Sequence, residues 1–97
     1  PERQLIRWLN AQEEPPVVVS TACRELAVWT QATSHWIHCD HDPLQVRQLF
    51  QHLDVDYLIL YPGQRGCRVV EGLENDFEPV ESFGAAEEAI DVLRWRG

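Results

Sequence analysis

Two short apolar runs constrain the fold of this chain most. Residues 17–20 (VVVS) follow a pair of prolines that ends any preceding helix, and the run at residues 57–61 (YLILY) stops at a Pro-Gly pair. Continuous β-branched and aliphatic runs of this length are typical of strands that are covered on both faces. We therefore expect both runs to be inner strands of a sheet.

Segments with helical periodicity alternate with these runs. Residues 1–12 carry an apolar stripe at helical spacing, formed by Leu5, Ile6, Trp8 and Leu9. Residues 21–31 have a weaker helical pattern. Residues 43–53 give the clearest helix, because Asp42 and Pro43 suit the N-cap and the first helical position, and Gln45 could complete a capping box.

The remaining segments complete the predicted architecture. Residues 35–39 are half polar, which favours a strand nearer a sheet edge, and residues 64–76 are compatible with a short covering helix. The segments FEPVESFG and AIDVLRWR are interpreted as two strands of a hairpin. The sequence thus predicts a single α/β domain over residues 1–97, three-layered, with a mostly parallel sheet, flanking helices and a C-terminal antiparallel hairpin.

Charge and composition exclude several classes of function. The 97 residues include 16 Asp and Glu against 8 Arg, for a net charge of −8. Such a chain repels phosphate backbones, so nucleic acid is not an expected partner. No apolar run is long enough to span a bilayer, and no signal-peptide pattern is visible. Since Pro1 is not a translation start, we expect the chain to be a piece of a longer protein.

The segment SHWIHCDHDP (residues 34–43) raises the question of a metal site. If residues 35–39 are a strand, neighbouring side chains point to opposite faces, so the best ligands do not converge. His38, Asp40 and His41 could meet only if the strand ended early and the following loop folded back. We expect no metal and no cofactor, and keep these three residues as weak candidate ligands.

Nucleophilic chemistry has little support in the sequence. Cys39 lies beside histidines, but adjacent strand residues diverge, so no base is placed against the thiol. The three cysteines fit neither a disulfide framework nor a metal knuckle, which leaves buried thiols or one pair. The acidic pairs at residues 13–14 and 87–88 are interpreted as solubilising surface. We predict no catalytic residue.

A ligand would bind at the carboxyl ends of the parallel strands, where open α/β sheets place their sites. Thr21 follows the first strand, and Tyr61, Gln64 and Arg65 follow the third, so all four are candidate ligand-binding residues for a sugar or a phosphate. The segment PGQRG has no glycine-rich phosphate fingerprint, and a plain turn remains the alternative for it.

The order of these segments resembles a known family. The segments that carry the resemblance are WLN, PVVVSTACRELAVWTQ, DPLQVRQLFQHLDVDYLIL, FEPVESFG and VLRWR. Together they resemble the soluble C-terminal domain of bacterial multi-pass membrane glycosyltransferases, similar to protein mannosyltransferases and lipid A aminoarabinose transferases. A related pattern has Thr-Gly-Arg where this chain has Thr30, Gln31 and Ala32, so no role of that arginine is carried over.

The resemblance implies a parent enzyme that uses a sugar linked to a polyprenyl phosphate. It places this domain on the extracytoplasmic, periplasmic side of the bacterial inner membrane, as a non-catalytic accessory domain. Its partners would be the transmembrane portion of the same chain and a lipid-linked sugar or acceptor. The alternative, from the residues alone, is a freestanding flavodoxin-like domain for small-ligand binding or signalling.

Overall fold

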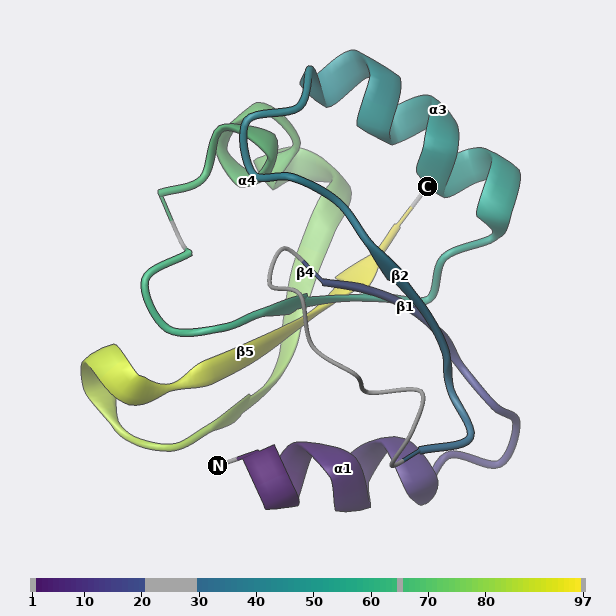
Figure 1. Ribbon diagram of the computed structural model, residues 1–97, viewed down its shortest axis with the longest axis vertical. Helices are drawn as coiled ribbons and strands as arrows, with labels where there is room; N and C mark the ends of the chain where they lie inside the picture. Colours follow the sequence, from purple (N-terminus) through teal and green to yellow (C-terminus); the bar gives the residue numbers. More distant parts are fainter. Residues whose placement is uncertain (1, 21–29, 65, 97) are drawn as a thin grey trace.

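The computed structural model describes residues 2–20, 30–64 and 66–96. Within these residues the chain forms one five-stranded sheet with helices packed against it (Figure 1). The elements are α1 (Glu2–Asn10), β1 (Val17–Ser20), β2 (Thr33–Trp36), α3 (Pro43–Leu53), β3 (Tyr57–Leu60), α4 (Arg68–Gly72), η1 (Glu74–Asp76), β4 (Phe77–Phe83), η2 (Ala86–Glu88) and β5 (Ile90–Trp95). The α/β class expected from the sequence is confirmed, whereas the helix predicted over 21–31 falls mainly outside the described residues.

The sheet is mixed rather than mostly parallel. Its strand order is β2-β1-β3-β5-β4, in which β1 pairs parallel with β2 and with β3. The other two pairings, β3 with β5 and β5 with β4, are antiparallel. The predicted parallel pairing holds for β1, β2 and β3, whereas the C-terminal pair of β4 and β5 joins β3 through β5, so that two of the four pairings are antiparallel.

The two apolar runs are inner strands, as predicted. In β1, Val18 and Val19 are completely buried, and in β3 Leu58 and Ile59 are as well. Successive strand residues point to opposite faces, so each of these strands contributes to both sides of the sheet. Continuous apolar sequence at these positions is the consequence of burial on two faces.

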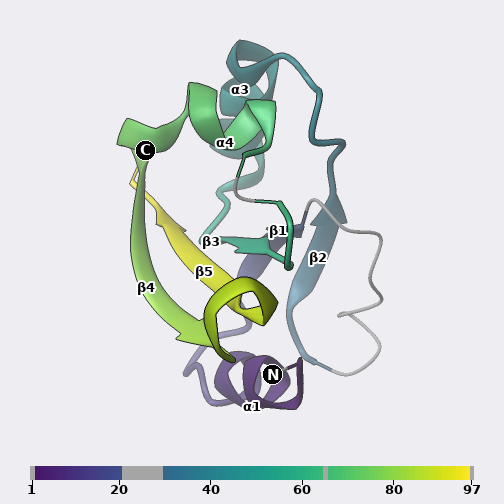
Figure 2. The ribbon, with the colours of Figure 1, turned by 90° about the vertical axis from the view of Figure 1, so that its left-hand side faces the viewer.

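Each face of the sheet carries its own apolar cluster. One cluster joins Val19 and Leu58 to Phe50 of α3 and Val69 of α4. The other joins the opposite face of the same strands to α1 and to Ile90 and Val92 of β5. Figures 1 and 2 show the sheet lying between α1 on one side and α3 with α4 on the other.

Strand β2 is an edge strand, as expected, but it is shorter and begins earlier than predicted. It spans Thr33–Trp36 rather than residues 35–39, because its register with β1 pairs Thr33 with Val17 and ends where Trp36 meets Ser20. One further bond, from the Ile37 N–H to the Ser20 carbonyl (3.0 Å), closes the pairing. The chain then turns away from the sheet, so Cys39 lies in a turn.

The predicted start of α3 is confirmed. Asp42 has an extended backbone, and its side-chain Oδ1 accepts a hydrogen bond from the Leu44 N–H (3.1 Å), while Pro43 occupies the first helical position. An N-cap carboxylate satisfies a backbone donor that the helix itself leaves without a partner. The helix ends at Asp54, whose left-handed backbone (φ 52°) closes it with a bond from its N–H to the Phe50 carbonyl.

The two C-terminal strands lie where the sequence predicts them. β4 and β5 pair antiparallel, and β4 forms the second edge of the sheet. The register shifts between Pro79 and Glu81, so that Val80 is an extra residue in β4. Pro79 has no N–H to donate, and prolines and bulges of this kind are typical of edge strands.

A disulfide joins Cys39 to Cys67, 28 residues apart in the sequence, with their Cα atoms 5.2 Å apart. Cys39 lies in the turn after β2, and Cys67 is the N-cap residue of α4. The Val69 N–H also donates to the Cys39 carbonyl (3.2 Å). The turn after β2 and the start of α4 are thus held together twice. The sequence left open whether the cysteines are buried thiols or include one disulfide pair. Cys39 and Cys67 form such a pair, and Cys23 lies outside the described residues.

Replacing Phe50 with alanine should lower the free energy of unfolding by about 3 to 5 kcal/mol, as for a buried aromatic side chain. Phe50 is completely buried, and its ring makes edge contacts with Phe77 and Trp95 at centroid distances of 5.8 and 5.3 Å. Urea unfolding measures the change. The matched control on the same helix is Leu44→Ala, which removes a side chain that is 64% exposed and should change stability by less than about 0.5 kcal/mol. Equal effects of the two variants would contradict the assigned core.

Replacing both Cys39 and Cys67 with serine should lower the free energy of unfolding by about 3 to 4 kcal/mol, from the chain entropy of the 28-residue separation. Urea unfolding of the oxidised protein, of the reduced protein and of the double serine variant measures the change. The reduced protein and the variant should agree to within about 1 kcal/mol, since both lack the cross-link. An oxidised protein no more stable than the variant would show that the bridge does not form.

Candidate functional site

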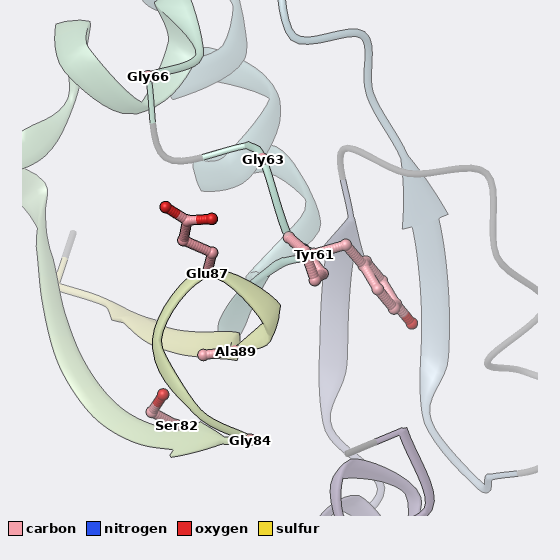
Figure 3. A pocket seen from close by; sticks show the side chains of 8 residues that line it. Tyr61, Gly63, Gly66, Ser82, Gly84, Glu87 and Ala89 are labelled. Atoms are coloured by element: carbon pink, nitrogen blue, oxygen red, sulfur yellow. The ribbon is translucent and has the colours of Figure 1, made fainter.

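A large cavity lies at the carboxyl end of β3. It has a volume of about 790 Å³ and is open to solvent. We call it the carboxyl-edge cleft (Figure 3), and its lining residues are Tyr61, Pro62, Gly63, Gly66, Ser82, Gly84, Glu87 and Ala89. One wall comes from the loop after β3 and the other from the connection between β4 and β5. The cleft therefore brings together segments about 20 residues apart in the sequence.

The first wall is a tight turn that requires glycine. The Gln64 N–H donates to the Tyr61 carbonyl (3.2 Å), and Gly63 between them has φ 86°. A proline followed by a glycine with positive φ is typical of a type II turn. A Cβ built on Gly63 or on Gly66 would meet nothing within 4 Å. The glycines therefore leave space open beside the loop.

The second wall supplies the polar side chains. Ser82 lies near the end of β4, and its hydroxyl donates to Asp91 Oδ1 of β5 at 2.9 Å. Glu87 lies in η2, and Figure 3 shows its carboxylate reaching toward the loop that contains Gly63 and Gly66. Gly84, with φ 99°, lets the chain leave β4 and turn into η2. A hydroxyl and a carboxylate thus face glycine-rich backbone across the cleft.

Of the four predicted ligand-binding residues, the structure describes Tyr61 and Gln64, and neither presents its side chain in the cleft as a polar group. The loop that follows β3 lies at the cleft, as the sequence suggests for the carboxyl end of a strand. Tyr61, however, is only 5% exposed; its ring belongs to the cluster beneath α1 and points away from Glu87 and Ser82 (Figure 3). Gln64 is half-buried beside the turn. Thr21 and Arg65 lie outside the described residues.

The segment with three histidines forms a small surface cluster instead of a converging ligand set. The Nδ1 atom of His41 accepts from the His38 N–H, and the Nδ1 atom of His38 accepts from the Asp40 N–H, both at 3.3 Å. Trp36, 56% exposed, makes an edge contact with His38 at a centroid distance of 6.2 Å. One nitrogen of each of these two imidazoles is therefore engaged with the backbone of its own loop.

Cys39 offers this cluster no thiolate, because its sulfur is bonded to Cys67. The same bond removes Cys39 as a nucleophile for the neighbouring histidines. Among residues 2–20, 30–64 and 66–96, no group of three or more His, Cys, Asp or Glu side chains is arranged to hold a metal ion. His38, Asp40 and His41 remain candidates on sequence grounds only.

The chemistry available in the cleft is recognition by hydrogen bonds and charge. Ser82 donates its proton to a carboxylate, so its hydroxyl oxygen is left to accept, and Glu87 accepts as well. These groups suit ligand hydroxyl or amine donors. They do not form a nucleophile, base and orienting group in series, which is the arrangement that acyl or glycosyl transfer through a protein nucleophile requires.

Sequence reasoning missed the second wall. Glu87 was interpreted as part of a solubilising acidic pair, and Ser82 drew no attention in a strand of alternating polar residues. The signal that could have found them is Gly84, which follows an aromatic strand end and precedes a run of small and acidic residues. A connection of that composition suits a turn at the sheet edge, but only the pairing of β5 with β3 places it beside the β3 loop.

Comparisons of the chain with protein-family models, with curated proteins and with solved structures give no match.

Zinc should not bind saturably at micromolar concentration. The expected result follows from the engaged Nδ1 atoms of His38 and His41 and from the disulfide at Cys39, which leave too few ligands for a tetrahedral site. Titration of the oxidised protein with Zn²⁺, followed through the four histidine side-chain NMR resonances, is the measurement. Stoichiometric shifts of His38 and His41 that His38→Ala abolishes would establish a metal site instead.

Proposed function

We propose that this chain is a non-catalytic, ligand-binding accessory domain of a membrane glycosyltransferase that uses a polyprenyl-phosphate-linked sugar. The observation that carries the binding role is the carboxyl-edge cleft, with Ser82 and Glu87 facing a glycine-rich loop. The glycosyltransferase context comes from the resemblance of the sequence segments. The proposal takes the domain as a three-layer unit closed by a C-terminal antiparallel hairpin, the finer architecture predicted from the sequence.

The cleft suits part of a sugar or a sugar acceptor. A volume of about 790 Å³ is within the range of small-ligand sites. The lining combines glycine backbone and the apolar side chains of Pro62 and Ala89 with a few polar groups. Glu87 and the Ser82 oxygen can accept hydrogen bonds from ligand hydroxyls. An acidic lining disfavours the phosphate of a donor, so the carrier phosphate is assigned to the membrane portion of the enzyme.

The disulfide supports a position outside the cytoplasm. Disulfides form and persist in oxidising compartments, among them the bacterial periplasm, and are rare in reducing ones. The bridge between Cys39 and Cys67 also joins the segment after β2 to the helix that follows the cleft loop. In an oxidising compartment this disulfide would persist and would hold the end of the loop after β3 to the segment after β2.

A contact with the membrane portion has to use a surface other than the apolar stripe of α1. Leu5 and Leu9 are completely buried against the sheet, and Trp8 makes edge contacts with Tyr57 and Phe83. The stripe therefore packs within its own domain, as amphipathic helices commonly do. In the described part of the chain, no helix has the length and apolar character needed to cross a bilayer.

The strand order favours one alternative. In β2-β1-β3 the chain leaves β1 for a neighbour on one side and then for a neighbour on the other, which creates a switch point at the carboxyl ends of β1 and β3. Flavodoxin-like domains begin with this order and bind ligands at that point. A freestanding domain for small-ligand binding or signalling is therefore the second candidate.

The proposal is tested in the full-length parent protein with the double variant Ser82→Ala and Glu87→Gln. We expect normal membrane insertion and at least about fivefold slower glycosyl transfer, since the Ser82 hydroxyl is lost and the Glu87 acceptor loses its charge, at about 0.5 to 1.5 kcal/mol each. The matched control is Glu88→Gln, which alters the neighbouring exposed carboxylate outside the cleft lining.

Unchanged transfer by the double variant, at equal protein level, would rule out a binding role of the cleft in the enzyme. Deleting residues 1–97 distinguishes an accessory role from a purely structural one. A structural role predicts loss of membrane insertion, whereas an accessory role predicts an inserted protein with reduced transfer. A parent protein that fractionates without membranes would favour the freestanding alternative.

A further inference from the structure

A surface patch of aromatic and polar side chains lies where the chain leaves β2. Trp36 is the last residue of this strand, and its large apolar side chain is 56% exposed. Its ring makes an edge contact with His38 at a centroid distance of 6.2 Å, and the rings of His38 and His41 lie 5.9 Å apart. We call these three residues, together with Asp40 and Arg68, the β2 patch. All five belong to the part of the chain that the structure describes.

The two imidazoles of the patch each offer a hydrogen-bond donor to solvent. The Nδ1 atom of His38 accepts from the Asp40 N–H, and the Nδ1 atom of His41 accepts from the His38 N–H. A ring nitrogen that accepts carries no proton, so the proton of each neutral ring is on Nε2. Both side chains are exposed, and each therefore directs an N–H away from the backbone of the turn.

Asp40 and Arg68 add an acceptor and further donors. The side chain of Asp40 is 82% exposed, so its carboxylate can accept hydrogen bonds from a ligand. Arg68, the first residue of α4, donates from Nη1 to the Asp40 carbonyl at 3.4 Å. A ligand hydroxyl can use both kinds of group, because it donates and accepts. The patch thus combines one exposed indole with a ring of groups that suit hydroxyls.

The turn that carries the patch is fixed before any ligand binds. Cys39, between the two polar residues His38 and Asp40, is bonded to Cys67, and its carbonyl accepts from the Val69 N–H at 3.2 Å. Figure 1 shows the chain after β2 passing beside α4, where this link is made. A surface that is ordered in advance loses less conformational freedom on binding. The cross-link therefore favours recognition by the turn.

We propose that the β2 patch binds a sugar ring, with the apolar face of the ring stacked on Trp36 and its hydroxyl groups bonded to the imidazoles and to Asp40. A pyranose has C–H bonds on one face, which are attracted to the electron-rich face of an aromatic ring, and hydroxyls around its rim. A purely apolar ligand would leave the polar groups unused. The patch shares no residue with the lining of the carboxyl-edge cleft, so this inference does not rest on the proposed function.

The test is a titration of the oxidised protein with methyl β-galactoside, methyl β-glucoside and methyl α-mannoside, followed through the indole and imidazole NMR resonances. We expect saturable shifts of Trp36 and His38 with at least one glycoside, at a dissociation constant of about 1 to 10 mM, since an open surface gains few contacts. Cyclohexanol has an apolar ring with one hydroxyl, and glycerol has hydroxyls without a ring. Each should bind at least about fivefold more weakly than the best glycoside.

Two sets of variants separate stacking from hydrogen bonding. Trp36→Ala should weaken binding about two- to tenfold, and Trp36→Phe should restore most of it because it keeps an aromatic face. Asp40→Ala should weaken binding about two- to tenfold through the lost acceptor. The matched controls are Leu44→Ala, which removes another exposed apolar side chain, and Glu88→Ala, which removes an exposed carboxylate outside the patch. Neither control should change the affinity, and circular dichroism confirms that each variant is folded.

The inference is wrong if none of the three glycosides gives saturable shifts, or if Trp36→Ala binds them as tightly as the original protein. Cyclohexanol or glycerol that binds as tightly as the glycosides would overturn it as well, because half of the patch would then be sufficient. Shifts confined to the lining of the carboxyl-edge cleft would overturn it while supporting the proposed function. Glycoside binding at Trp36, with unaffected transfer in the Ser82 and Glu87 double variant, would refute only the proposed function.

Discussion

The whole domain depends on the burial of β1 and β3 on both faces. Successive residues of these two strands, such as Val18 and Val19, belong to different apolar clusters. Helix α1 can cover one side, and α3 with α4 the other, only because both sides of the same strands are apolar. At the carboxyl end of β3 the loop that follows this strand lies beside the connection between β4 and β5, and the cleft forms there.

The disulfide extends this order beyond the sheet. Strand pairing ends at Trp36 and Leu60, and the segments that follow are held to the sheet by buried side chains such as Ile37 and Tyr61. The bond between Cys39 and Cys67, with the hydrogen bond from the Val69 N–H to the Cys39 carbonyl, joins these segments to each other. This link and the burial of Val69 in the core together hold α4 against the sheet.

Local sequence patterns predicted most of the fold. Residues 17–20 and 57–61 were placed correctly as inner strands because their burial on two faces appears in their own composition. Asp42 and Pro43 located the start of α3 because capping is a local interaction. The C-terminal antiparallel pair was expected, but the sequence did not predict that β5 is the strand that pairs with β3, since this is a pairing of distant segments that no local pattern encodes. For the same reason the start of β2 was predicted two residues late.

The candidate site was less predictable than the fold. Sequence reasoning pointed to the sheet edge at which the carboxyl-edge cleft lies, because the carboxyl ends of parallel strands follow from the strand order. It selected Tyr61 by its polar hydroxyl, although that side chain is buried in the cluster beneath α1. Ser82 and Glu87 come from a segment whose place beside the β3 loop depends on antiparallel pairing.

The bulge in β4 also affects how this edge of the sheet can pair with another copy of the chain. A regular seven-residue edge strand would offer a template for the edge of another copy, whereas Pro79 interrupts its row of donors and Val80 breaks its repeat. The irregularity that bends this strand therefore also makes its edge a poorer template for pairing with another copy.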